Sequence, residues 1–216
     1  MQDDTVIVIA GGGTLPPRPR PPAGRARVVA ADEGVDHALA LGLRVDIAVG
    51  DFDSVSPAGL AAAEAAGARI ARHQAEKDAT DLELALDEAV ALAPRRLLVL
   101  GVDGGRLDHL LASLLGLGSD RYAELEVDAL LGAASVHVVR GERRLEGEPG
   151  ELISLFALHA PAEDVTTAGL AYGLSGETLR PGSSRGVSNV FAEREARISV
   201  GRGIVLVVRP GPGGTR

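Results

Sequence analysis

The chain has 216 residues, 45% of them hydrophobic, which is enough for one large globular domain or two modest ones. A formal net charge of -8, with no long basic run, argues against a general nucleic-acid-binding protein, because phosphates must be faced by cations. The absence of cysteine excludes disulfides and thiolate zinc sites, and together with an acidic N-terminus and no membrane-length apolar run it leads us to expect a cytoplasmic protein.

The first half of the chain alternates short apolar runs with helical patterns. The strands predicted from these runs are residues 5–10, 27–31, 45–49, 68–71, 96–101, 125–131 and 135–139. The predicted helices are residues 34–42, 57–66, 82–93 and a leucine-rich segment that ends near 117. Such alternation predicts an α/β domain with a largely parallel sheet, which binds ligands at the carboxyl ends of its strands.

The second half of the chain has a different pattern. Short strands are predicted at residues 151–158, 165–172, 186–191, 196–200 and 203–209, with Gly, Pro and Ser turns between them and no helical period. This pattern predicts a small all-β domain of the sandwich or barrel type. We therefore divide the chain into an α/β domain, residues 1–133, and an all-β domain, residues 134–216.

Two loops of the first half are rich in glycine or proline. Gly11-Gly12-Gly13 follows the first strand and can bring backbone N–H groups close to a phosphate. It lacks the spacing of a dinucleotide fingerprint and has no P-loop lysine, so a flexible turn is the better interpretation. Residues 15–24 contain five prolines and are predicted to form a surface loop.

The stretch 49–54 (VGDFDS) places two carboxylates directly after the third strand. In an extended segment Asp51 and Asp53 would point the same way, about 6–7 Å apart at the usual rise per residue. Two ionised carboxylates repel unless a cation lies between them, and a hard divalent ion such as Mg²⁺ would serve. The alternative is a polar turn, because Gly, Asp and Ser are common turn residues.

A second acidic stretch, 76–83 (EKDATDLE), leads into the next helix. Asp78 or Thr80 is expected to cap this helix, with Asp81 or Glu83 as the partner in a capping box. A helix start beside the first acidic loop would also bring Asp78 and Asp81 into one acidic cluster.

The charges expected near these loops suit a reaction at phosphate groups. The acidic set has no matching set of histidines, so hard oxygen ligands favour Mg²⁺ or Mn²⁺ over zinc. Lys77 and Arg106 supply positive charge near the same loops, which suits phosphate oxygens. Phosphoryl transfer mainly needs positioning and charge stabilisation, which such a site offers.

Six short stretches, in this order and spacing, resemble the thiamine pyrophosphokinase family. They are 31–34 (ADEG), 50–54 (GDFDS), 77–81 (KDATD), 104–109 (GGRLDH), 169–174 (GLAYGL) and 186–189 (GVSN). The resemblance implies a Rossmann-like catalytic domain, a C-terminal β-sandwich and a homodimer with active sites shared between subunits. It also implies transfer of the pyrophosphoryl group of ATP to the thiamine hydroxyl, giving thiamine diphosphate and AMP.

The resemblance further implies roles for individual residues. The catalytic carboxylates would be Asp51, Asp53, Asp78 and Asp81, one of which would accept the hydroxyl proton. Mg²⁺ would be held by Asp51, Asp53 and Asp81. ATP would be bound by Asp32, Lys77, Thr80, Gly105, Arg106, Asp108 and His109. Thiamine would be bound by Asp51, Tyr172, Ser188 and Asn189.

Departures from the family leave alternatives open. The family usually has glycine where this chain has Glu33, so a phosphate would meet a carboxylate there. The chain has no Trp, and Tyr172, with Phe191 as second choice, is the candidate for stacking on the pyrimidine ring; both are equally well explained as core aromatics. Asp108 and His109 are also explained by helix N-terminal charge and capping.

Two rival functions remain at the level of sequence. A pyrophosphokinase acting on another heterocyclic alcohol, such as a hydroxymethylpterin, would use similar loops, although the second half favours thiamine. A nucleotide-binding regulatory module without catalysis is suggested by Glu33 and opposed by the complete acidic set.

Overall fold

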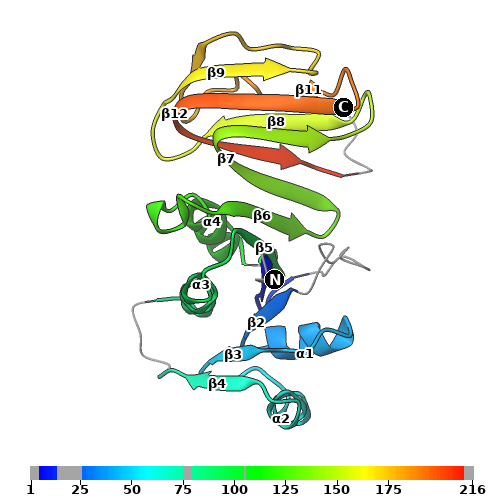
Figure 1. The fold of residues 1–216 in the computed structure, drawn as a ribbon, viewed down its shortest axis with the longest axis vertical. Helices are drawn as coiled ribbons and strands as arrows, with labels where there is room; N and C mark the ends of the chain where they lie inside the picture. Colours follow the sequence, from blue (N-terminus) through cyan, green and yellow to red (C-terminus); the bar gives the residue numbers. More distant parts are fainter. Residues whose placement is uncertain (1–4, 14–25, 75–78, 105, 212–216) are drawn as a thin grey trace. The chain divides into compact units, whose positions relative to one another are not determined.

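The computed structural model describes residues 5–13, 26–74, 79–104 and 106–211. They form two compact units (Figure 1). Unit 1 comprises the described residues of Met1–Gly116 and Glu124–Gly132, and unit 2 those of Leu117–Ala123 and Ala133–Arg216. The chain enters unit 2 for the last time at Ala133, one residue before the predicted boundary between residues 133 and 134. Nothing in the sequence indicated that Leu117–Ala123 also belong to unit 2.

The described part of unit 1 is built on a parallel sheet. Its strands are β1 (Thr5–Ile9), β2 (Arg27–Ala31), β3 (Ile47–Gly50), β4 (Arg69–Arg72), β5 (Arg96–Leu100) and β6 (Glu126–Leu131). Their order is β6-β5-β1-β2-β3-β4, and each of these pairings is parallel. Val6, Val8 and Leu97 are fully buried, because strands covered on both faces need apolar side chains at successive positions.

Helices connect the strands of unit 1. They are α1 (Gly34–Ala40), α2 (Pro57–Ala65), α3 (Asp81–Ala91) and α4 (Leu107–Gly116). Ser56 caps α2 by accepting a hydrogen bond from the Gly59 N–H, and a proline follows at the first helical position. Thr80 caps α3 through the Glu83 N–H, while Asp78, the other predicted cap, lies outside the described residues. None of the helices in the described ranges is long and apolar enough to cross a membrane.

The described part of unit 2 is an antiparallel β structure. Its strands are β7 (Ala134–Glu146), β8 (Leu152–Ala157), β9 (Ala162–Ala168), β10 (Glu177–Leu179), β11 (Asn189–Val190) and β12 (Glu195–Arg209), and Asp120–Tyr122 add the short 3-10 turn η1. The long strand β12 pairs with β7, β8 and β9, which lie beside it in Figure 1. At the margins, β10 pairs with β9 and β11 pairs with β8.

Glycines account for some of the differences between the predicted and observed strands of unit 2, but not for the extension of β7 to Glu146 or for the presence of β10. The strands predicted at 196–200 and 203–209 form the single strand β12, because a register shift there absorbs the positive φ of Gly203 without ending the pairing. Two other strands are shorter than predicted, because Gly169 and Gly186 have positive φ and interrupt the extended backbone.

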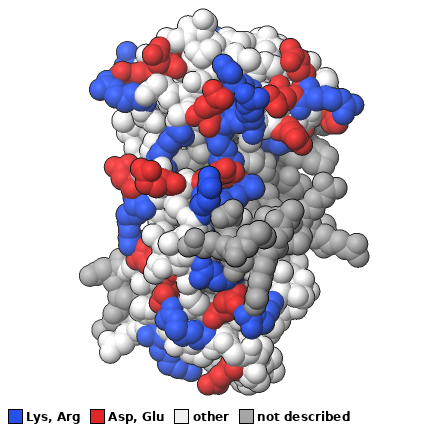
Figure 2. Space-filling view, viewed as in Figure 1, with Lys and Arg blue, Asp and Glu red and all other residues white. Residues whose placement is uncertain are grey.

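Each unit packs its own apolar core, built mostly from aliphatic side chains as the 2% aromatic content requires. In unit 2 the ring of Phe191 is 1% exposed and belongs to this core. Ion pairs of unit 2 include Arg202–Glu163. The face shown in Figure 2 carries both signs of charge. Among the described residues of that face no single basic patch is seen.

Candidate active site

The loops at the carboxyl ends of the parallel strands gather the polar residues of unit 1. Gly11, Gly12 and Gly13 follow β1, Asp32 and Glu33 follow β2, Asp51 and Asp53 follow β3, and Asp103 and Gly104 follow β5. Parallel strands end at the same edge of the sheet, so these loops are neighbours. The loops after β1 and β5 touch, since a Cβ on Gly12 would lie 3.0 Å from the Gly104 Cα.

Asp32 holds the loop that carries Asp51 and Asp53, which we call the acidic loop (residues 51–55). Its Oδ1 accepts a hydrogen bond from the Phe52 N–H at 3.0 Å. Gly50 has a φ of 142°, and a Cβ there would lie 1.9 Å from Asp32 Oδ1, so glycine makes room for this carboxylate.

The acidic loop is a tight turn. Phe52 has a φ of 64°, and Asp51 Oδ1 accepts the Asp53 N–H at 3.2 Å, as in an Asx-turn. The stretch is therefore not extended, and the polar turn, the alternative interpretation of this sequence, is the conformation that the structure shows. Left-handed φ values, here and at Asp32 (45°), are uncommon outside glycine and often mark functional loops.

Asp32 is 9% exposed, and its pKa is raised, mainly by burial and further by the neighbouring carboxylates. Burial raises this pKa from its ordinary value of 3.8 to about 6, although the Phe52 N–H opposes the increase. Charge repulsion from Asp81 and Asp51, and a side-chain hydrogen bond with Asp81, add to the increase. The start of α3 thus lies close to the ends of β2 and β3, and a bound cation would relieve the repulsion.

As they lie, these carboxylates do not make a closed metal site. Within the described ranges, no three Asp, Glu or His side chains are arranged to hold an ion. The structure brings Asp51 and Asp81 near Asp32, whereas the side chain of Asp53 is exposed. Three further predicted residues lie outside the described ranges: Asp78, Lys77 and Gly105.

The far end of the acidic loop is held by Asp36 of α1, which the sequence did not single out. Its carboxylate accepts both the Ser56 N–H and the Ser56 Oγ–H at 2.7 Å. A Cβ on Gly59 would lie 1.9 Å from Asp36 Oδ1, which explains glycine at the third position of α2. The segment from Asp32 to Asp36 therefore fixes the acidic loop at both ends.

The last three residues of the GGRLDH stretch, Leu107, Asp108 and His109, begin α4. Arg106 and Asp108 make an exposed ion pair with an Nη2–Oδ2 distance of 2.7 Å. The hydrogen bond from Arg106 lowers the pKa of Asp108 to about 2, and Asp108 in turn raises the pKa of Arg106. His109 is exposed, and its carbonyl accepts the Ser113 Oγ–H at 2.7 Å. The three predicted nucleotide-binding side chains are therefore accessible to a ligand.

Glu33 lies at the edge of the glycine turn. It is exposed at the N-cap of α1, makes no capping hydrogen bond, and its Cβ is 3.0 Å from the place that a Cβ on Gly11 would take. Asp103 borders the same turn on the β5 side, with an Oδ1 that is buried without a hydrogen-bond partner against Gly13. This chain therefore flanks the glycine turn with two carboxylates, of which only Glu33 was noticed in the sequence.

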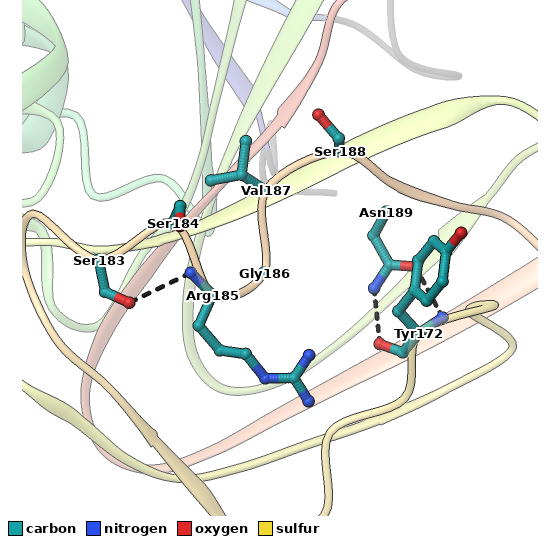
Figure 3. Close-up of a pocket in the computed structure, with 8 residues that line it drawn as sticks. All are labelled: Tyr172, Ser183, Ser184, Arg185, Gly186, Val187, Ser188 and Asn189. Carbon is teal, nitrogen blue, oxygen red and sulfur yellow. Dashed lines mark hydrogen bonds between the residues drawn. The ribbon is translucent and has the colours of Figure 1, made fainter. Parts of the chain in front are cut away.

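Unit 2 has an open pocket of about 570 Å³ (Figure 3). Its lining residues are Tyr172, Ser183, Ser184, Arg185, Gly186, Val187, Ser188 and Asn189. The ring of Tyr172 is 56% exposed, whereas the alternative aromatic, Phe191, is 1% exposed in the core. A volume of this size suits a small organic ligand.

Ser188 has an unusual conformation in this pocket. Its φ is 56°, and its N–H donates to Ser154 Oγ of β8 at 3.0 Å. This tie holds a left-handed turn in which the Ser188 side chain stays exposed.

Two family models match consecutive parts of the chain. One, described as the catalytic domain of thiamin pyrophosphokinase, matches residues 24–127, and the other, its vitamin B1 binding domain, matches residues 136–205. The chain belongs to the thiamine pyrophosphokinase family. The catalytic-domain model spans the acidic loop and the start of α4, and the vitamin B1 model spans every residue of the pocket in unit 2.

Relatives and solved structures of thiamine pyrophosphokinases agree with this assignment. The chain is 28% identical over 183 residues to thiamine pyrophosphokinase of Bacillus subtilis, covering 84% of this chain and 86% of that protein. The solved Bacillus subtilis structure matches with a TM-score of 0.85 and 25% identity, over 96% of this chain and 99% of that one. A thiamin pyrophosphokinase family protein of Enterococcus faecalis matches with a TM-score of 0.81 and 29% identity, over 94% and 97%.

Ser183, Ser184 and Arg185 line the pocket of unit 2, although they were assigned no role from the sequence. Their position directly before the GVSN stretch was the available signal. Asp36 had no comparable signal, because its partner Ser56 is 20 residues away.

Proposed function

We propose that this protein transfers the pyrophosphoryl group of ATP to the hydroxyl of thiamine, giving thiamine diphosphate and AMP. The observation that carries this proposal is the match of both family models, the catalytic domain to residues 24–127 and the vitamin B1 binding domain to residues 136–205. In the reaction, the thiamine hydroxyl oxygen bonds to the β-phosphorus, the bond from that phosphorus to the oxygen bridging the α-phosphate breaks, and AMP leaves.

In this proposal Mg²⁺ is held by Asp51 and Asp53 of the acidic loop and by Asp81 of α3, with Asp78 as a further catalytic carboxylate. The support is chemical: carboxylates are the ligands that Mg²⁺ prefers, and Asp51 and Asp81 both lie near enough to Asp32 to raise its pKa by charge repulsion. Bound Mg²⁺ would neutralise charge on the phosphates. One of four carboxylates, Asp51, Asp53, Asp78 or Asp81, takes the proton of the thiamine hydroxyl.

The remaining proposed ligands of ATP include Lys77 and Gly105, which lie outside the described residues. Lys77 and Arg106 would face phosphate oxygens, since ammonium and guanidinium groups bind them with charge-assisted hydrogen bonds. Asp108 and His109 would shape the nucleotide site at the exposed start of α4. Asp32, Thr80 and Gly105 complete the proposed set.

Thiamine is proposed to bind in the pocket of unit 2, lined by Tyr172, Ser188 and Asn189. The exposed Tyr172 ring offers a flat apolar face to the pyrimidine, and the Ser188 hydroxyl is free to hydrogen-bond. We further propose a Rossmann-like first domain, a β-sandwich second domain, a cytoplasmic location and a homodimer with shared active sites.

The decisive experiment measures AMP and thiamine diphosphate together, with ATP, Mg²⁺ and thiamine, against a blank without thiamine. Equal amounts of both products are expected. AMP formed without thiamine would indicate another acceptor or a hydrolase, and ATP binding without any AMP would indicate a regulatory module.

The acidic loop is tested by Asp53→Asn, which keeps the shape of the side chain and removes its charge. We expect kcat/KM to fall by about 100-fold or more, because the charge stabilises the reacting phosphates through the metal site. Glu64→Gln, at an exposed position of α2, is the matched control and should keep full activity. An unchanged rate in Asp53→Asn would remove Asp53 from the site.

A further inference from the structure

Asn189 lines the pocket of unit 2, but its side chain is engaged elsewhere. The residue is 1% exposed. Its Oδ1 accepts the Tyr172 N–H at 3.0 Å, and its Nδ2 donates to the Tyr172 carbonyl at 2.7 Å (Figure 3). The Val190 N–H donates to the same Oδ1 at 2.9 Å. Both functions of the amide are therefore used by the main chain, and almost no surface is left to offer a ligand.

The side chain of Asn189 continues, by one residue, the main-chain pairing that begins between Ala171 and Val190. The Ala171 N–H donates to the Val190 carbonyl at 3.0 Å. At the next position the main chain of Tyr172 meets the Asn189 amide, which takes the place of another peptide group. The main chain of Asn189 itself pairs with β8. One residue therefore connects β8 to the turn that carries Tyr172.

A second tie reaches the same turn from Arg185. Its Nη2 donates to the Gly173 carbonyl at 3.3 Å, while Nε and Nη2 donate to the Glu177 carboxylate at 2.8 and 2.6 Å. The side chains of this ion pair are 45% and 39% exposed, so solvent screens the interaction. The buried amide of Asn189 is the stronger of the two ties, because its loss would leave buried main-chain groups unpaired.

We propose that Asn189 is a positioning residue of the thiamine pocket, which fixes the main chain of Tyr172 so that the Tyr172 ring forms the wall against which the substrate ring packs. This inference rests on the proposed function. Asn189 acts through Tyr172 and does not itself contact the substrate. Releasing the main chain would let the exposed ring swing away from its wall position and weaken thiamine binding, without touching the reacting phosphates.

Kinetics of single and double variants test this assignment. Asn189→Asp keeps the acceptor for the Tyr172 N–H but cannot donate to the carbonyl, and Tyr172→Ala removes the wall. We expect each variant to raise the KM for thiamine by about fivefold to tenfold, as loss of one net hydrogen bond or one ring contact would. The KM for ATP and kcat should stay within about twofold, because only binding of thiamine is affected.

The double variant separates positioning from contact. If Asn189 acts through Tyr172, the KM for thiamine of the double variant equals that of Tyr172→Ala, because the wall is already gone. Effects that multiply would instead make Asn189 an independent substrate contact and overturn the proposal. An equal rise in the KM for ATP would also overturn it, since it would indicate a general structural role.

Two control variants accompany the series. Glu177→Gln weakens the exposed ion pair without changing a residue that lines the pocket, and should raise the KM for thiamine by no more than about twofold. Ile198→Val truncates a fully buried core residue of β12, which lowers stability while leaving both KM values unchanged. A rise in the KM for thiamine in Ile198→Val would mean that lost stability alone explains the Asn189 result.

Hydrogen exchange tests, without substrate or turnover, whether the Asn189 amide holds the main chain of Tyr172. Asn189→Leu keeps the size of the side chain and removes both bonds, so the Tyr172 amide should lose its protection while amides of β12 keep theirs. Unchanged protection of the Tyr172 amide would show that Asn189 does not hold this main chain, and would overturn the proposal. Failure of the wild-type protein to make thiamine diphosphate would instead overturn the proposed function and leave the exchange result standing.

Binding can also be followed by fluorescence. The chain contains two Tyr and no Trp, so Tyr122→Phe leaves Tyr172 as its one tyrosine reporter. Thiamine added without ATP should change this emission, and Asn189→Asp should shift the midpoint to about fivefold higher thiamine, matching the loss of one hydrogen bond. No emission change with thiamine in the Tyr122→Phe protein would contradict the wall role of Tyr172.

Discussion

The side chain of Asp32 accepts the Phe52 N–H and lies beside Asp81 and Asp51, so one residue both shapes the acidic loop and adds to its charge. The hydrogen bond needs only an acceptor oxygen, whereas the repulsion needs the full charge. The two contributions can therefore be separated by a neutral side chain of the same shape.

Asp32→Asn is expected to stabilise the metal-free protein at about pH 8 by roughly 1–2 kcal/mol, because a folded-state pKa near 6 means that ionising Asp32 costs stability. The sign follows from the raised pKa: the contribution of wild-type Asp32 is fully present below its ordinary pKa of 3.8 and is lost as pH rises through about 6. Urea unfolding with a chelator, at about pH 4 and pH 8, measures the difference. Equal stability of both proteins at the higher pH would contradict the repulsion.

At the scale of elements, α1 and α2 are joined through one carboxylate. Asp36 of α1 accepts two hydrogen bonds from Ser56, whose Oγ in turn accepts the Gly59 N–H at 2.9 Å and so caps α2. The acidic loop is therefore held at one end by the hydrogen bond from the Phe52 N–H to Asp32 and at the other by the hydrogen bonds from Ser56 to Asp36. Its geometry therefore depends on the first turn of α1, although α1 carries none of the proposed metal ligands.

Asp36→Ala should lower the free energy of unfolding by about 1–3 kcal/mol, because two hydrogen bonds to a charged acceptor are lost. It should also raise the Mg²⁺ concentration that gives half-maximal activity, since the acidic loop loses one anchor. Asp36→Asn, which keeps one acceptor oxygen, is the matched control with a smaller loss. Thermal unfolding and Mg²⁺ titration provide the two measurements, and wild-type values for Asp36→Ala would show that the tether is dispensable.

The elements differ in how well the sequence predicted them. The strands of unit 1 were recognisable because continuous β-branched runs such as 5–10 are typical of buried parallel strands, and the Thr80 cap follows from local chemistry. β12 was divided in two, because only pairing with three other strands carries it past Gly203. Long-range pairing of this kind leaves no local pattern.

The candidate site shows the same limit. The acidic and GVSN stretches were found because their residue types cluster along the chain. The roles of Asp36 and Asn189 depend on partners 20 and 17 residues away, and their local sequence is compatible with ordinary surface or binding positions. Tertiary contacts alone distinguish a residue that touches a ligand from one that holds its neighbour.

At the scale of the whole molecule, the proposed homodimer has one candidate surface in the described part of unit 1. The helix α4 has no buried residue, and its leucines Leu107, Leu111 and Leu115 are 77%, 54% and 41% exposed. Spaced four residues apart, they share one face of the helix. Exposed apolar faces of this kind commonly mark association sites.

Leu111→Glu should convert a dimer to a monomer in sedimentation or light scattering and lower activity together with it, because a charge cannot be buried unpaired in an interface. Ala112→Glu places the same charge on a neighbouring exposed position of α4 and should have the smaller effect. A wild-type protein that sediments as a monomer, or a Leu111→Glu protein that stays dimeric, would exclude this face.

The position of β12 has a consequence for synthesis. Three strands of unit 2 pair with this one strand, and it is the last strand described in the chain. A ribosome releases the N-terminal part first, so β7, β8 and β9 emerge with open edges and wait for residues 195–209. Unit 1 needs nothing beyond Gly132 for its sheet and can form earlier. Unpaired strand edges in this interval are templates for wrong pairing, so the second half of the nascent chain is exposed to mispairing until β12 has emerged.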